Sequence, residues 1–149
     1  MIFSGGCHCG CIEIEFATEI DPSRLEVRAC QCSFCRKHDS RAVGDPNGRI
    51  AIRVNDPATL SSYEFGLRTA TYLVCGRCGV YVAAVTKEEP LRAIAIVNAL
   101  RDHERFSQPA RAVDYGNENR EERLSRRRHN WTPATVMTVA PSRAPARSP

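Results

Sequence analysis

The residues of this sequence best suited to chemistry are eight cysteines, which fall in three short clusters. The clusters are Cys7/Cys9/Cys11, Cys30/Cys32/Cys35 and Cys75/Cys78. Thiols two or three residues apart rarely satisfy disulfide geometry with each other, but together they can bind one cation. Eight cysteines in 149 residues is also below the roughly 8–10% typical of disulfide-built secreted domains. The sequence therefore predicts a metal protein rather than a disulfide scaffold.

Four of these thiols, contributed in two pairs, suit one closed metal site. Cys75 and Cys78 are separated by two residues, which lets both sulfurs face one ion, and each is followed by a glycine that tolerates a positive φ in a tight turn. If the chain is extended at Cys7 and Cys9, these two side chains point to the same side. Two pairs give a Cys₄ set, typical of structural zinc, on which we expect folding to depend. The alternative for Cys75 and Cys78 is a pair of buried cysteines flanking a plain hairpin turn.

The cluster Cys30, Cys32 and Cys35 supplies three thiols with no obvious fourth ligand. Three protein ligands and an open position are the pattern of catalytic zinc. Arg36 and Lys37 follow at once, and their positive charges would lower the pKa values of the thiols and attract anions. Two alternatives remain open, namely a site closed by His38 and a Cys₃ site with a purely structural role.

Cys11 belongs to neither set. A buried cysteine usually behaves as a small hydrophobic residue, and this interpretation is favoured for Cys11 over a ligand role. His8 alternates away from its neighbouring cysteines, while His103 and His129 lie in Arg-rich sequence typical of a surface.

The elements that must position the cysteines are mostly short strands. Ile12–Phe16 alternates cleanly between apolar and acidic residues, as a half-buried strand does. Similar segments, rich in β-branched and aromatic residues and separated by turn signals, predict a small, mainly β domain. The further expected strands are Leu25–Arg28, Ile50–Val54, Leu60–Phe65, Thr69–Val74, Val80–Val85 and Leu91–Leu100.

The C-terminal part differs from the rest of the chain. Asn117–Arg128 has acids early and arginines late, the order that the helix dipole favours, and predicts a short helix. Leu124 is its only large apolar residue, so the helix should lie on the surface, with Trp131 as an apolar anchor behind it. We expect one domain over residues 1–133 and a flexible tail over residues 134–149, disordered from about Ala140 onward.

The net charge of +4 comes entirely from residues 101–149, since residues 1–100 carry 11 basic and 11 acidic side chains. Arg123 and Arg126–Arg128 form a basic patch that raises the alternative of a nucleic-acid binder. Acidic residues lie within one or two turns of it, and no aromatic residues are interleaved for base stacking. Seven thiolates and two zinc ions would also bring the whole chain near +1. These features argue against a nucleic-acid partner.

The sequence also gives expectations about location. Residues 1–6 have neither the basic region nor the apolar core of a signal peptide. No apolar run approaches the ~18 residues of a membrane span. A cytoplasmic protein with no membrane partner is expected, in a reducing compartment that suits thiolate ligands.

Taken in order, the three clusters resemble those of the glutathione-dependent formaldehyde-activating enzyme family, which includes centromere protein V. The resemblance covers about residues 3–100, with a similar ending through Trp131-Thr132-Pro133, although Gln31 stands where many members have His. The segments that carry it are Gly5-Gly6-Cys7-His8-Cys9-Gly10, Cys30-Gln31-Cys32-Ser33-Phe34-Cys35-Arg36-Lys37 and Cys75-Gly76-Arg77-Cys78-Gly79.

This resemblance implies a fold of several coiled antiparallel sheets around two zinc sites. Cys7, Cys9, Cys75 and Cys78 match its structural zinc ligands, and Cys30, Cys32 and Cys35 match its catalytic zinc ligands. The activity implied is that of a carbon–sulfur lyase, which acts on a small-molecule thiol and an aldehyde and whose named product is S-hydroxymethylglutathione. The alternative function is a non-catalytic, zinc-stabilised binding module.

Overall fold

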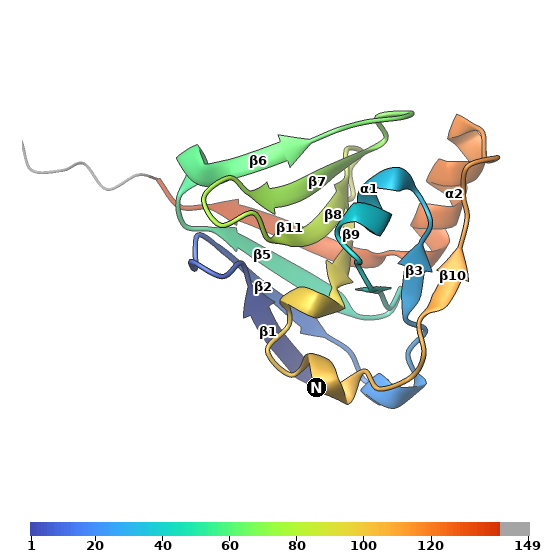
Figure 1. The fold of residues 1–149 in the computed structure, drawn as a ribbon, viewed down its shortest axis with the longest axis horizontal. Helices are drawn as coiled ribbons and strands as arrows, with labels where there is room; N and C mark the ends of the chain where they lie inside the picture. Colours follow the sequence, from blue (N-terminus) through green and yellow to red (C-terminus); the bar gives the residue numbers. More distant parts are fainter. Residues whose placement is uncertain (141–149) are drawn as a thin grey trace, which may run out of the picture.

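The computed structural model describes residues 1–140, which form a mainly β fold with eleven strands connected into one sheet (Figure 1). The strands are β1 (Ile2–Gly6), β2 (Ile12–Ala17), β3 (Arg28–Cys30), β4 (Ala42–Val43), β5 (Arg49–Val54), β6 (Leu60–Tyr63), β7 (Ala70–Cys75), β8 (Tyr81–Thr86), β9 (Arg92–Ile96), β10 (Arg111–Val113) and β11 (Thr132–Thr138). The helices are α1 (Ser33–Lys37) and α2 (Arg120–Asn130), with short 3₁₀ turns at Pro22–Arg24, Pro57–Thr59, Val97–Ala99 and His103–Arg105.

One part of the sheet has the strand order β1-β2-β5-β11. The alternation predicted from the sequence is confirmed in β2, where Ile12, Ile14 and Phe16 are buried and the glutamates between them are exposed. Its partner β5 runs antiparallel and places Ile52 opposite Ile14. These apolar side chains form one side of the core.

Strand β11 corrects the expected domain boundary. Residues 134–138 pair in parallel with residues 50–54 of β5, so the chain is still part of the sheet where the flexible tail was expected to begin. Most side chains of β11 are exposed, and backbone pairing rather than burial therefore holds this strand in place. The disorder expected from about residue 140 falls almost entirely on residues 141–149, outside the described residues.

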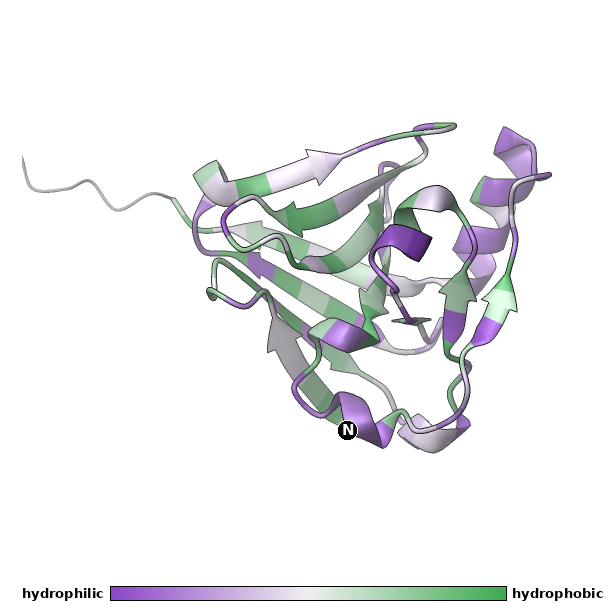
Figure 2. Cartoon of the chain, viewed as in Figure 1, coloured by the Kyte–Doolittle hydropathy of each residue, from purple (hydrophilic) through white to green (hydrophobic). Residues whose placement is uncertain are grey.

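A second part of the sheet is the antiparallel meander β6-β7-β8-β9. Five of the six residues of β8 are buried, because neighbouring strands and loops cover both of its faces. The apolar colouring of β7 and β8 in Figure 2 follows this burial. The turn between these two strands carries Cys75 and Cys78.

The third part joins β4, β3 and β10 to β9. Here the strand expected at Leu25–Arg28 is wrong in its limits, since β3 begins at Arg28 and ends at Cys30. Leu25 and Val27 are nevertheless buried, so their apolar pattern reflects packing of an irregular segment. The pairs β3–β10 and β5–β11 are parallel, which makes the sheet mixed rather than wholly antiparallel.

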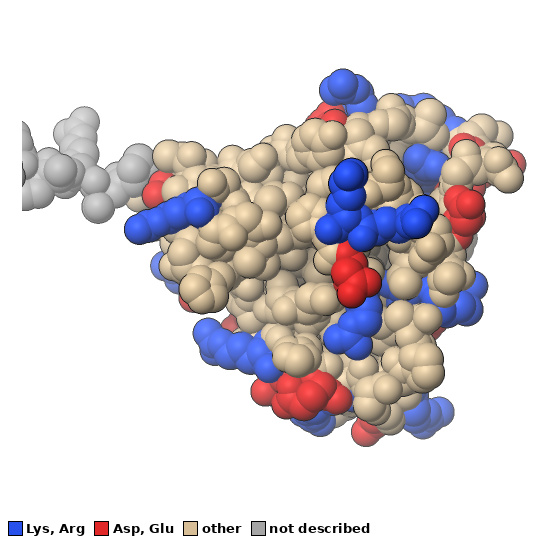
Figure 3. All heavy atoms as spheres, viewed as in Figure 1, with Lys and Arg blue, Asp and Glu red and all other residues tan. Residues whose placement is uncertain are grey.

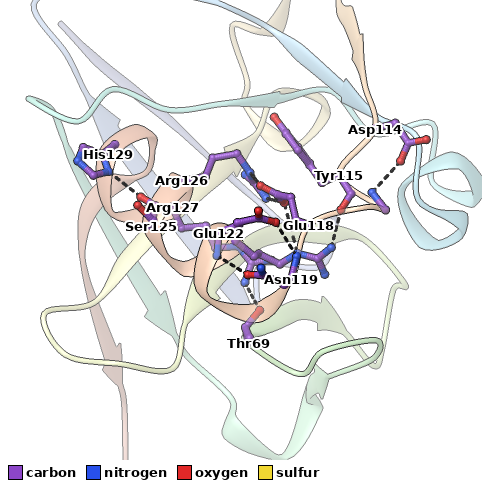
Figure 4. Close-up of polar contacts among 12 residues, drawn as sticks. Thr69, Asp114, Tyr115, Glu118, Asn119, Glu122, Ser125, Arg126, Arg127 and His129 are labelled. Atoms are coloured by element: carbon purple, nitrogen blue, oxygen red, sulfur yellow. Dashed lines mark hydrogen bonds and ion pairs between the residues drawn. The ribbon is translucent and has the colours of Figure 1, made fainter.

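The predicted C-terminal helix is confirmed as α2, shifted by a few residues, and it lies beside β3 and β10 (Figure 1). Asn119 and Glu122 form a capping box, in which each side chain accepts a hydrogen bond from the backbone N–H of the other (Figure 4). Arg127 is buried along with Leu124, so the helix has more to bury than its sequence indicates. No helix of residues 1–140 is long and apolar enough to cross a membrane.

An ion pair between Glu118, just ahead of α2, and Arg126, within this helix, gives a prediction for stability. Arg126 donates two hydrogen bonds of 2.8 and 2.9 Å to Glu118. Burial alone would raise the pKa of Glu118, but the hydrogen bond and charge of Arg126 outweigh it and lower the pKa. A carboxylate with a lowered pKa stabilises the fold above its unfolded pKa of about 4.3, and this stabilisation is lost as the pH falls through the folded pKa.

We therefore expect Glu118→Gln to lower the free energy of unfolding by about 1 kcal/mol at pH 7 and by less at pH 3, measured by urea unfolding. Glu121→Gln is the matched control. The Glu121 side chain is 76% exposed and pairs with Arg128 at 3.4 Å, so its loss should have little effect. An equal loss of stability for Glu118→Gln at both pH values would show that the stabilisation does not come from the charged Glu118–Arg126 pair.

Candidate metal centres and active site

The first candidate metal centre joins the loop between β1 and β2 to the turn between β7 and β8. The Sγ atoms of Cys7, Cys9, Cys75 and Cys78 all lie within 4.8 Å of one another. The sulfurs of Cys7 and Cys9 are 3.8 Å apart, and those of Cys9 and Cys75 are 3.5 Å apart. Zn–S bonds of about 2.3 Å in a tetrahedron require sulfurs about 3.8 Å apart. The donor set therefore fits a tetrahedral, thiophilic ion.

The backbone around these cysteines differs in two details from the expected one. Cys7 and Cys9 converge through a turn, closed by a 3.2 Å hydrogen bond from the Gly10 N–H to the Cys7 carbonyl, and not along an extended strand. In the second turn Gly79 has φ +79°, as expected. Gly76 is required for a steric reason instead, because a Cβ at this position would lie only 2.9 Å from a backbone oxygen and would clash with it.

The second candidate centre lies where β3 leads into α1. The Sγ atoms of Cys30, Cys32 and Cys35 are mutually within 4.8 Å, and this group contains no fourth ligand from residues 1–140. Cys32 is the N-cap of α1, so the start of the helix brings Cys35 back toward it. The N–H of Cys35 donates a 3.4 Å hydrogen bond to the Cys32 sulfur, which favours the thiolate.

The pKa values of the thiols in this second group are shifted in opposite directions. Hydrogen bonds from Cys30 and Cys35 lower the pKa of Cys32. Hydrogen bonds with Cys30 and Cys32, together with burial, raise the pKa of Cys35 well above its ordinary value. A cation that binds all three sulfurs must therefore displace protons, as metals do at thiol sites.

A small cavity lies beside the three-cysteine group. Its volume is about 50 Å³, and Cys30 and Cys35 form part of its wall. The wall is otherwise mainly aromatic and basic, and comes from β3, β4, β7, β8, β9, β10 and α2 and the segments next to them. Its other lining residues are Arg28, Ala42, Tyr72, Tyr81, Ile94, Val113, Tyr115, Arg126, Arg127 and Trp131. At roughly 10–15 Å³ per enclosed water, the space suits a small molecule or a few waters.

Burial sets the charge states of the groups around this cavity. It raises the pKa of Tyr72 to about 12 and raises that of Tyr81 well above its ordinary value, and the thiols add to both shifts. Burial also lowers the pKa of Arg127 to about 10. At neutral pH the two tyrosines are therefore hydroxyl donors, and Arg127 remains a cation.

Two residues on the solvent side of α1 were expected to attract anions. Arg36 and Lys37 are exposed in the last turn of this helix. Basic side chains gather over α1 on the face shown in Figure 3, with acidic ones between them. These cations lie close in sequence to Cys35 without lining the cavity, and can therefore act on an approaching anion rather than on a bound one.

Comparison with known proteins identifies the family. A family model described as glutathione-dependent formaldehyde-activating enzyme matches residues 2–132. The chain belongs to this family. It also resembles the crystal structure of a Rhodobacter sphaeroides protein, with 28% sequence identity and a TM-score of 0.55, over 74% of this chain and 99% of that chain.

Two uncertain residues of this formaldehyde-activating-enzyme family member can now be placed. Cys11 is buried in the core, and its sulfur accepts a 3.4 Å contact from Cys9 but is not part of the four-cysteine group. His38 is not part of the three-cysteine group either. Its exposed ring instead packs on Phe34, with the ring centroids 4.6 Å apart.

The cavity wall is the part of the site that sequence reasoning missed. Tyr72 and Tyr81 lie on the consecutive strands β7 and β8, whereas Arg127 lies much later in the chain on α2, and no motif links the three. An arginine on the apolar side of α2, four residues before Trp131, was the available signal. Its guanidinium lies 4.6 Å from the ring centroid of Trp131.

Proposed function

We propose that this protein is a zinc-dependent carbon–sulfur lyase-like enzyme that acts on the adduct of formaldehyde with glutathione. The observation that carries the proposal is the three-thiol group of Cys30, Cys32 and Cys35, which has no fourth ligand among residues 1–140 and two of whose members, Cys30 and Cys35, line the small cavity. Membership in the formaldehyde-activating family supports the substrates. Zinc in this group would act as a Lewis acid, polarising an aldehyde oxygen or activating a thiol.

Different residues of the chain would hold the ion, accommodate the one-carbon unit and attract glutathione. The three cysteines hold the ion and leave one position open. The cavity has room for the one-carbon unit but not for a tripeptide, so the body of glutathione must lie outside it. The exposed Arg36 and Lys37 are placed to attract the carboxylates of glutathione.

The four-cysteine group has a different role in this proposal. Cys7, Cys9, Cys75 and Cys78 would hold a second zinc ion with no open position, which is the structural type of site. This ion ties the β1–β2 loop to the β7–β8 turn and contributes to folding. We place the reaction in a reducing cytoplasm, where both thiolate sets persist.

The proposal predicts faster transfer of the hydroxymethyl group between free formaldehyde and glutathione. Exchange spectroscopy by NMR on a glutathione–formaldehyde mixture measures this rate directly. We expect micromolar zinc-loaded protein to raise the exchange rate severalfold over buffer, while the same concentration of zinc salt does not. An exchange rate equal to that of buffer would refute the glutathione reaction and favour a non-catalytic binding module.

A further inference from the structure

Two residues in the wall of the cavity beside Cys30 and Cys35 each carry a buried polar atom that lacks a hydrogen-bond partner. Among residues 1–140, four buried side-chain nitrogen or oxygen atoms have no partner, and two of them, the Tyr81 hydroxyl and Arg127 Nε, belong to residues of this wall. The two residues are 4% and 5% exposed. An unpartnered buried donor destabilises the fold, so native proteins rarely retain one without a use.

Arg127 is only partly satisfied by its surroundings. Its Nη1 donates a 2.5 Å hydrogen bond to Thr69 Oγ1 (Figure 4), and its guanidinium packs on Trp131. Within residues 1–140 no carboxylate forms an ion pair with it, whereas Arg123 and Arg126 share Glu118. Arg127 therefore contributes to the cavity wall a buried positive charge with which no carboxylate of residues 1–140 forms a direct ion pair.

Rings pack around Tyr81, and none of them supplies a hydrogen-bond partner for its hydroxyl. The centroids of Phe34, Tyr72 and His38 lie 5.1, 5.8 and 5.5 Å from that of Tyr81. A phenylalanine would pack in the same place and bring no desolvated hydroxyl. The hydroxyl is thus explained by a ligand rather than by packing.

Both unpartnered groups can donate a hydrogen bond, so the ligand they fit is an acceptor oxygen that carries or gains negative charge. We propose that the Tyr81 hydroxyl is a catalytic hydrogen-bond donor to the substrate oxygen beside the three-cysteine group, with Arg127 as a second donor. This inference rests on the proposed function and extends it, since it names the oxygen subsite and restricts the substrate to small aldehydes and their thiol adducts.

The step that such a subsite assists is balanced in atoms and electrons. The electron pair of the thiol sulfur forms the C–S bond, the C=O π pair moves onto oxygen, and that oxygen takes up one proton. The thiol gives up one proton in the same reaction, so the number of protons is unchanged. Tyr81 retains its own proton and stabilises the charge that develops on oxygen, as donors of an oxyanion hole do.

Tyr81→Phe tests the inference by removing only the hydroxyl. We expect the second-order rate constant for hydroxymethyl exchange to fall about 100-fold in the zinc-loaded protein. The thermal midpoint should stay the same or rise, because an unpartnered group has been removed. Tyr63→Phe is the matched control, since Tyr63 is 48% exposed, stacks on Phe34 and does not line the cavity. Tyr81→Phe with the wild-type rate would overturn the inference and leave the proposed function standing.

A binding measurement separates the two claims without turnover. Trp131 is the single tryptophan of the chain and lines the cavity, so its fluorescence reports occupancy. Formate, a one-carbon oxyanion, should change this fluorescence saturably, about tenfold more weakly in Tyr81→Phe and unchanged in Tyr63→Phe. If the wild type accelerates no exchange, the proposed function fails and this formate affinity alone decides the inference. Equal affinities for wild type and Tyr81→Phe would overturn it.

Discussion

Cys78→Ser is expected to remove one metal ion per chain and to leave the protein largely unfolded at 25 °C. The four-cysteine group connects segments nearly 70 residues apart, the β1–β2 loop and the β7–β8 turn. Structural zinc sites contribute about 10–16 kcal/mol of apparent binding free energy, which equals or exceeds the roughly 5–15 kcal/mol stability of a whole domain. Circular dichroism and metal content of the purified variant measure the two effects.

Cys11→Ala is the control for this prediction. Cys11 is buried, whereas Cys78 is half-buried, and the Cys11 sulfur is 3.4 Å from that of Cys9, but Cys11 lies outside the four-cysteine group. It should keep both metal ions and lose only the modest stability of a small core truncation. A Cys78→Ser protein that retained two ions and the wild-type thermal midpoint would show that this group is not a structural metal site.

The second large effect is expected for Cys32→Ser, which should lose the other metal ion and the whole acceleration of hydroxymethyl exchange while remaining folded. The group spans only the end of β3 and the five-residue helix α1, so its loss leaves the main strand pairings intact. We expect the exchange rate to fall to that of buffer and the thermal midpoint to fall by only a few degrees, measured by NMR and calorimetry.

Ser33→Ala is the matched control, because Ser33 is the exposed neighbour of Cys32 on the same helix. It should retain two metal ions and the wild-type rate. Loss of the metal in Cys32→Ser without any change in rate would instead identify the three-cysteine group as a structural site.

The division of the cysteines could be predicted from the sequence because it depends on local spacing. Cys75 and Cys78 lie on one turn, and Cys30, Cys32 and Cys35 on another short segment, so each set is brought together by a few residues. The long-range pairing of Cys7 and Cys9 with the turn that carries Cys75 and Cys78 could be predicted because a closed zinc site needs four ligands. The strands around Ile12–Phe16 and Ile50–Val54 could also be predicted from their alternating pattern, since one face of each is buried.

Strand β11 and the cavity wall could not be predicted in this way. Thr135, Val136 and Met137 are exposed, so no burial pattern marks the strand, and its parallel pairing with β5 is a property of the backbone. Tyr81 and Arg127 meet at the cavity only because β8 and α2 pack around the same space. Such convergence depends on tertiary packing, which the one local signal, an arginine four residues before Trp131, does not specify.

Metal counting tests the central claim, two separate thiolate centres, most directly. The protein is prepared under reducing conditions with excess zinc, passed through a desalting column and analysed by elemental mass spectrometry against protein concentration. We expect two zinc ions per chain for the wild type and one for Cys32→Ser. One ion or none in the wild type, with all eight cysteines reduced, would contradict this claim.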